Sequence, residues 1–164
     1  VSALSKMIYV DGIKNIKLDF AGRYCSEFMT EIENHKLLEF SDLKGFVPHN
    51  ESTKILNNAD CLLLVVDDVP DNKGFLTGKL FEYMGTKKPI FAIGPVNGDA
   101  HEYIKQSYSG IMVDYRDEGS AYNSLKEMYN NWNTGNNNYT FDVGQFSRKN
   151  LTEKLAKVFE EIIK

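Results

Sequence analysis

Apolar and polar residues recur along this chain with two different periods, and together they predict strands alternating with helices. Five strands are expected, at residues 16–21, 43–47, 61–66, 89–93 and 111–113. The third is continuously apolar, which is typical of a parallel strand whose sheet has helices on both faces. This order predicts an α/β fold with a doubly wound, Rossmann-like parallel sheet flanked by helices.

Helical spacing of apolar residues begins at Val1, and capping patterns indicate where several later helices start. Helices are expected near the chain start and at residues 27–34, 51–58, from 77, from 99, 121–132 and 150–164, with Asn50, Thr77, Asp99 and Asn150 as caps. The last helix carries an apolar stripe, and residues 133–139 form an Asn-rich exposed loop. One domain over residues 1–164 is the simplest organisation.

Composition excludes several classes of protein. A net charge of -4 and a pI near 5.4 give no support for nucleic-acid binding. The apolar runs are too short to cross a bilayer, and no secretory signal segment opens the chain. Cys25 and Cys61 match no metal or disulfide motif, so we expect a cytoplasmic protein without a metal site.

Residues 72–95 hold the candidate chemistry. A glycine-containing loop leads from one apolar strand into a helix that starts near Thr77, and Lys79 and Glu82 lie in its first turns. First-turn amides and a lysine suit an anion, whereas a carboxylate accepts hydrogen bonds from neighbouring hydroxyls. The segment therefore predicts a site for an anionic, hydroxyl-rich ligand.

The same segment resembles a known family. Residues 77–83 (TGKLFEY) and 88–92 (KPIFA) are similar to the donor-binding segment of retaining, GT-B fold glycosyltransferases of the group 1, or family 4-like, type. Further pieces occur in that family's order, namely Ala21-Gly22, residues 44–47, residues 58–60 and residues 109–113. The resemblance covers most of the chain and implies the C-terminal half of a GT-B fold.

The resemblance also implies that a central first strand is missing. In that half the strand order is 3-2-1-4-5, and the first strand would precede Val1. Strands 16–21 and 61–66 would then flank a gap, which a partner chain, an upstream segment or a rearranged N-terminus would fill. We expect a fragment that lacks the N-terminal, acceptor-binding domain and does not catalyse transfer alone.

Site residues follow from the resemblance. Glu82 would hold the ribose hydroxyls, and Thr77, Gly78 and Lys79 would face the diphosphate, with no metal or cofactor required. Gly74 stands where the family often has a second glutamate, so sugar recognition there would use backbone amides of residues 74–77 or be lost. The plain alternative is that Lys79 and Glu82 form an exposed ion pair.

Three further residues are candidates on the opposite side of the cleft. Arg23 would approach the diphosphate, although an exposed arginine in a surface turn is the simpler interpretation. Val47 and His49 lie with Phe46 in the loop that frames the base in relatives; as alternatives, Phe46 and Val47 belong to the core and His49 only enters a helix. No catalytic residue is assigned.

The resulting hypothesis is a glycosyltransferase of polysaccharide biosynthesis. The whole enzyme would transfer a hexose-type unit from a uridine or guanosine diphosphate sugar to a glycan or lipid-linked acceptor, in the cytoplasm or at the inner face of the membrane with peripheral contact. A nucleoside deoxyribosyltransferase-like enzyme, with Glu82 as nucleophile, is one alternative. A non-enzymatic nucleotide-binding module is the other.

Overall fold

A computed structural model describes residues 1–136 and 139–163, and its fold is α/β with parallel sheets and flanking helices. The chain divides into two compact units, Val1–Asp60 with Val113–Asn138 and Cys61–Met112 with Tyr139–Lys164. The prediction of one domain over residues 1–164 stays a prediction.

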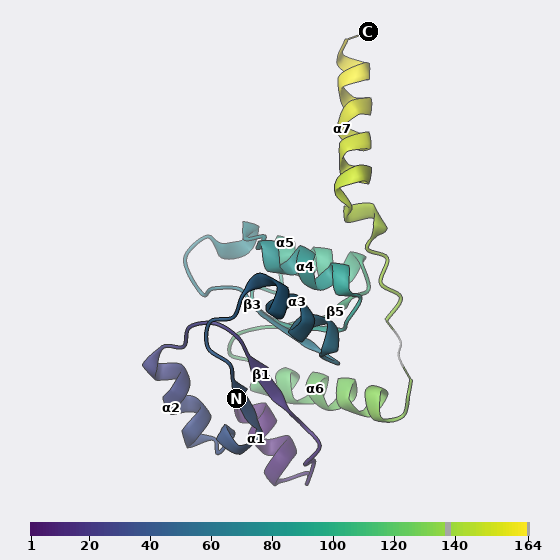
Figure 1. The fold of residues 1–164 in the computed structure, drawn as a ribbon. Helices are drawn as coiled ribbons and strands as arrows, with labels where there is room; N and C mark the ends of the chain where they lie inside the picture. The colour runs from purple at the N-terminus through teal and green to yellow at the C-terminus, as the bar shows by residue number, and fades with distance from the viewer. Residues whose placement is uncertain (137–138, 164) are drawn as a thin grey trace. The chain divides into compact units, whose positions relative to one another are not determined.

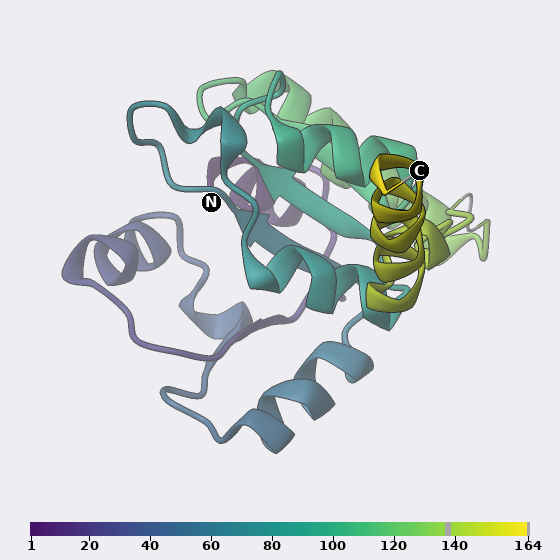
Figure 2. The same ribbon diagram turned by 90° about the horizontal axis from the view of Figure 1, so that it is seen from above.

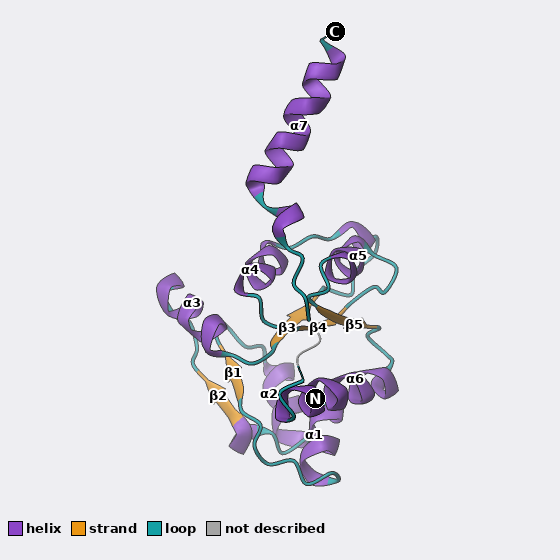
Figure 3. Cartoon of the chain, turned by 90° about the vertical axis from the view of Figure 1, so that its right-hand side faces the viewer, coloured by secondary structure: helices purple, strands orange, loops and turns teal. Residues whose placement is uncertain are grey.

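The first unit has a two-stranded parallel sheet. Its elements are α1 (Ser2–Tyr9), β1 (Leu18–Phe20), α2 (Ser26–Asn34), β2 (Ser41–Leu43), α3 (His49–Asn58) and α6 (Glu118–Asn133), with a 3-10 turn at Leu38–Phe40. Leu18 lies opposite Ser41 and Phe20 opposite Leu43 (Figure 3). Ile8, Ile32 and Leu37 are fully buried between these elements, so the predicted first two strands pair around a core of their own.

Helix α6 is bonded to the segment that follows α1, although the two are far apart in sequence. The Tyr122 hydroxyl donates to Asp11 Oδ2 at 2.7 Å, and the Tyr129 hydroxyl donates to Asn15 Oδ1 at 2.6 Å. The bond from Tyr122, and then one from Lys126, holds the pKa of the Asp11 carboxyl below its usual value. These bonds join the two stretches of chain that make up the first unit.

The second unit contains a three-stranded sheet in the order β3-β4-β5. Its elements are β3 (Leu62–Val65), α4 (Gly78–Thr86), β4 (Ile90–Ile93), α5 (Asp99–Gln106), β5 (Gly110–Val113) and α7 (Arg148–Ile162), with 3-10 turns at Asn72–Gly74 and Gly144–Phe146. β3 and β4 are parallel, and Leu62 lies opposite Ile90. The carboxyl ends of these two strands therefore lie at the same edge of the sheet.

Helices α4 and α5 cover one face of this sheet (Figures 1 and 2). Their apolar residues pack with those of the strands in one cluster, which contains Leu64, Val66, Leu80, Met84, Ile90, Ala92, Ala100, Ile104 and Met112. Burial of these side chains orders the unit, since each of the larger ones (valine, leucine, isoleucine and methionine) contributes about 1.5–3 kcal/mol when fully removed from water. The predicted strand–helix alternation is confirmed here.

The strands pair within each of the two units. β1 pairs with β2 and β3 pairs with β4, as the order 3-2-1-4-5 requires of its second and third and of its fourth and fifth strands. Within the described residues no ladder joins β1 to β3, and what fills the place of the first strand stays a prediction. Within the second unit, α4 and α5 cover one face of β3, and a helix on its other face stays a prediction. Leu63 and Val65 point away from α4 and α5, and their exposed fractions are 48% and 52%.

The predicted position of the second strand, residues 43–47, is wrong. β2 ends at Leu43, two residues before Gly45, whose φ of +65° is incompatible with a continuing strand. Phe46, placed in that strand by its apolar character, is 83% exposed. The alternative that Phe46 belongs to the core is therefore excluded, whereas Val47 is half-buried.

Several predicted helix starts are displaced. α3 begins at His49 after Pro48, α5 has Gly98 as its N-cap, and α7 has Ser147, whose hydroxyl accepts from the Asn150 amide. Asn50, Asp99 and Asn150 therefore lie inside their helices. At each of these helix starts more than one residue can serve as the N-cap, so the sequence motif alone does not fix the first helical residue. Residues 137, 138 and 164, which belong to the predicted loop at 133–139 and helix at 150–164, lie outside the described residues.

The predicted apolar stripe of α7 is present and exposed. Leu151, Leu155, Val158 and Ile162 have exposed fractions between 45% and 73%, and α7 has no buried residue along the length that its assignment covers. Within the described part of the chain, none of the helices combines the length and apolar character that a membrane crossing needs.

Candidate functional site

Helix α4 is held firmly by its apolar side. Leu80 is fully buried and Met84 is 2% exposed, and both pack against the three-stranded sheet. Tyr83, predicted on the solvent side, packs partly against the same core, whereas Phe81 is 38% exposed and meets the Tyr103 ring edge-on. The predicted apolar face is therefore rotated toward Tyr83.

The first turn of α4 has amide groups without a side-chain cap. Thr77 is the N-cap residue, as predicted, but its side chain makes no capping hydrogen bond. Its Oγ1 atom is buried and has no hydrogen-bond partner among the described residues. Gly78 and Lys79 follow as the first helical residues, and both are exposed. The exposed start of this helix can thus accept an anion at its amide groups, beside a buried hydroxyl that has no acceptor among the described residues.

Lys79 and Glu82 are both exposed, and no ion pair between them exists among the described residues. The alternative of a mutually paired lysine and glutamate is therefore not what the structure contains. A lysine ammonium group and a carboxylate, one turn apart, remain available to an external ligand.

The loop before α4 packs against the loop that follows β4. A Cβ atom placed on Gly98 would lie 2.8 Å from the Lys73 carbonyl oxygen and 3.2 Å from Lys73 Cα. Only glycine permits that approach. Beside it, a Cβ atom placed on Gly74 would lie 4.0 Å from Asp99 Oδ2. The Asn72 amide group donates to the Asp67 carbonyl at 2.8 Å and holds this loop in place.

The structure thus brings five predicted site residues into the second unit, namely Gly74, Thr77, Gly78, Lys79 and Glu82. The other three, Arg23, Val47 and His49, belong to the first unit. Arg23 and His49 are exposed there. Their part in binding the same ligand stays a prediction.

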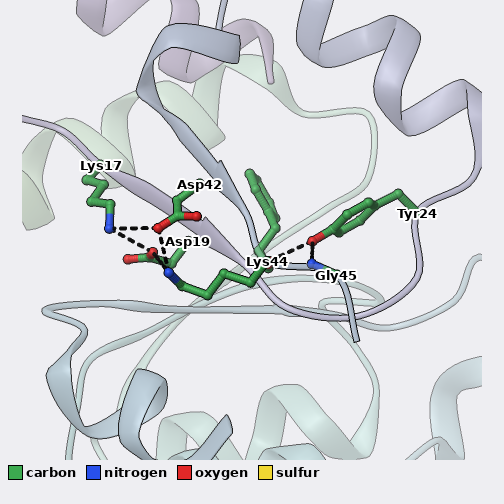
Figure 4. A network of polar contacts seen from close by, with 7 residues as sticks. Lys17, Asp19, Tyr24, Asp42, Lys44 and Gly45 are labelled. Atoms are coloured by element: carbon green, nitrogen blue, oxygen red, sulfur yellow. Dashed lines mark hydrogen bonds and ion pairs between the residues drawn. The ribbon is translucent and has the colours of Figure 1, made fainter. Parts of the chain in front are cut away.

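Within the first unit, a tyrosine joins the turns that carry Arg23 and Phe46. The Tyr24 hydroxyl donates to the Phe20 carbonyl at 2.7 Å and accepts from the Gly45 amide at 2.8 Å (Figure 4). The Gly22 amide also donates to the Gly45 carbonyl at 2.7 Å. The turns that follow β1 and β2 are therefore fixed beside each other.

A charged network on β1 and β2 was not anticipated from sequence. Lys17 and Lys44 each form ion pairs with Asp19 and Asp42 (Figure 4). The bond from Lys44, followed by that from Lys17, lowers the pKa of the Asp42 carboxyl. Alternating charges on two adjacent strands were the available signal. The four charges are thus paired with one another.

A groove between α1 and α6 was also missed. Ser2, Lys6, Glu118 and Tyr122 are among its lining residues. The Lys6 ammonium group lies 3.9 Å from the centre of the Tyr122 ring, so its charge already has an aromatic partner. The groove offers no arrangement comparable to the start of α4.

Neither protein-family models nor curated protein sequences match this chain.

Proposed function

We propose that this chain is the donor-binding part of a glycosyltransferase that uses a uridine or guanosine diphosphate sugar. The observation that supports this most is the start of α4, where uncapped amides adjoin the buried hydroxyl of Thr77, which has no partner among the described residues. A diphosphate supplies acceptor oxygens for these donors, and the helix dipole favours its negative charge.

The neighbouring side chains suit the rest of a nucleotide. Lys79 adds positive charge beside the diphosphate, and Glu82 lies one turn further along α4 with no ion-pair partner among the described residues. A carboxylate can accept hydrogen bonds from both ribose hydroxyls. When the sugar departs, charge grows on the diphosphate, and the amides of Gly78 and Lys79 stabilise it.

The proposal extends to the whole enzyme. It transfers a hexose-type unit to a glycan or lipid-linked acceptor in polysaccharide biosynthesis, in the cytoplasm and with peripheral membrane contact, and a further, acceptor-binding domain completes the active site. Arg23, Val47 and His49 belong to the first unit, and the roles that the resemblance implies for them stay predictions.

Calorimetric titration of the chain with uridine and guanosine diphosphates, and with the free nucleosides, tests the proposal. One of the diphosphates is expected to bind at least about tenfold more tightly than its nucleoside, since that ratio corresponds to about 1.4 kcal/mol from the diphosphate contacts. Equal binding of nucleoside and diphosphate would contradict it and favour the deoxyribosyltransferase-like alternative, in which Glu82 forms a covalent adduct. Absence of binding by both would also contradict it.

Thr77→Val is expected to raise stability and weaken binding at once. Removing a buried hydroxyl that has no partner among the described residues relieves its desolvation cost, so the free energy of unfolding should rise by about 1 kcal/mol. Loss of one hydrogen bond to the diphosphate should weaken binding roughly fivefold. Urea unfolding and calorimetry measure the two effects.

Thr86→Val provides the matched control at the other end of α4. The Thr86 hydroxyl donates to the Tyr83 carbonyl at 2.7 Å and accepts from the Lys88 amide at 3.2 Å. That variant should lose about 1 kcal/mol of stability without a change in nucleotide affinity. A lower free energy of unfolding in Thr77→Val than in the wild type would show that the Thr77 hydroxyl stabilises the fold instead.

A further inference from the structure

A close approach between two loops of the second unit positions a carboxylate at the candidate site. The loops follow β3 and β4, which are adjacent and parallel, so both leave the sheet at its carboxyl edge. Gly98 lies so near Lys73 that any side chain there would meet the Lys73 backbone. This contact sets the next residue, Asp99, against the 3-10 turn that ends at Gly74.

The Asp99 carboxylate is free to bind a ligand. It is exposed, and within the part of the chain that the structure describes it has neither a hydrogen bond nor an ion pair. Its expected role as a helix cap is not realised, because Gly98 is the N-cap residue of α5 and α5 has no side-chain cap. At the start of α5 its negative charge is favoured by the helix dipole, and its oxygens remain open to hydroxyl donors.

Gly74 leaves space beside that carboxylate. A Cβ atom on Gly74 would stand 4.0 Å from Asp99 Oδ2, which is ordinary contact distance, so a longer side chain there would compete for the same room. Gly74 also comes three residues before Thr77, at the entry to the first turn of α4. The space beside the carboxylate therefore lies on the loop that leads into the proposed diphosphate site.

Charge indicates which part of the donor belongs there. The start of α4 and Lys79 attract the diphosphate, whereas a carboxylate repels it. An uncharged group with several hydroxyls suits a carboxylate, which accepts two hydrogen bonds from neighbouring hydroxyls. In a nucleotide sugar, the transferred sugar is such a group, and it lies beyond the diphosphate from the ribose that Glu82 holds.

We infer that Asp99 binds hydroxyl groups of the transferred sugar and so contributes to sugar recognition. The inference rests on the proposed function. In this inference the sugar is recognised by a carboxylate from α5 and not by the backbone amides of residues 74–77 alone. Gly74 makes room for the sugar beside that carboxylate.

Titrations with and without the sugar test this inference. The ligands are UDP-glucose and GDP-mannose, compared with UDP and GDP, and the variants are Asp99→Asn and Glu102→Gln. Glu102 is an exposed carboxylate in the first turn of the same helix, so its variant removes the same charge. Asp99→Asn should weaken binding of the preferred nucleotide sugar about tenfold and change affinity for the diphosphate less than twofold. Glu102→Gln should change neither.

The outcomes separate the inference from the proposed function. If wild-type protein binds neither UDP nor GDP, the proposed function fails and the inference fails with it. If the diphosphate binds but Asp99→Asn leaves the nucleotide sugar unaffected, or weakens both ligands equally, the inference alone is overturned. If Asp99→Asn and Glu102→Gln weaken nucleotide-sugar binding equally, the loss of affinity comes from the change in net charge alone. That result would also overturn the inference.

Discussion

Gly110→Ala is expected to unfold the three-stranded sheet at temperatures where the wild-type protein is fully folded. A Cβ atom on Gly110 would lie 1.9 Å from the carbonyl oxygen of Ile90 and 2.7 Å from its carbonyl carbon. Ile90 is fully buried in β4, and its amide donates to the Ser109 carbonyl at 2.9 Å. The β4 backbone cannot yield without losing pairing and packing together, so the loss should be about 3 kcal/mol or more.

Urea unfolding followed by circular dichroism measures this loss, and Gly85→Ala is its control. Gly85 lies within α4, and nothing stands within 4 Å of an added Cβ. Alanine in a helix is favoured over glycine by roughly 0.5–1 kcal/mol, so that variant should gain stability. A Gly110→Ala protein as stable as the wild type would show that β4 and β5 do not approach as described.

Glu82→Ala is expected to weaken binding of the preferred nucleoside diphosphate by about ten- to a hundredfold. Hydrogen bonds to a charged group contribute about 1.5–3 kcal/mol each, and the proposed site loses those of the ribose hydroxyls. Because Glu82 is exposed and has no ion pair among the described residues, the variant should fold as well as the wild type. Calorimetry measures the affinity.

Inorganic pyrophosphate is the control ligand for Glu82→Ala. It presents the diphosphate without a ribose, so its affinity should be the same in the wild type and in Glu82→Ala, apart from a small rise on removal of a negative charge. A Glu82→Ala protein that binds the nucleoside diphosphate normally, or loses pyrophosphate as well, would contradict the role given to this residue.

The parts of the fold that the sequence predicted well depend on local apolar patterns. β3 and β4 are continuous apolar runs, and their core-facing residues, such as Leu64 and Ala92, are almost completely buried. β2 was misplaced because its own residues include Ser41 and Asp42, while the apolar Phe46 is turned outward after Gly45. A polar strand and an exposed phenylalanine are decided by neighbours that a local pattern does not include.

The candidate site likewise has one part that the sequence predicts and one part that it does not. The start of α4 was predictable, because Thr77, Gly78, Lys79 and Glu82 are close in sequence and share one short helix. The contact of Asp99 with Gly74 was not, since 25 residues separate them and Gly98 must pack against Lys73 to bring them together. The sequence indicated a cap at Asp99, and only the packing of two loops shows its carboxylate to be available.

Backbone amide resonances recorded during titration with UDP and GDP show whether the start of α4 binds the diphosphate. We predict saturable shifts at Gly78 and Lys79, larger than elsewhere in the chain, that inorganic pyrophosphate also produces and the free nucleosides do not. Saturable shifts confined to residues outside α4 and its preceding loop, or none with either diphosphate, would contradict this prediction.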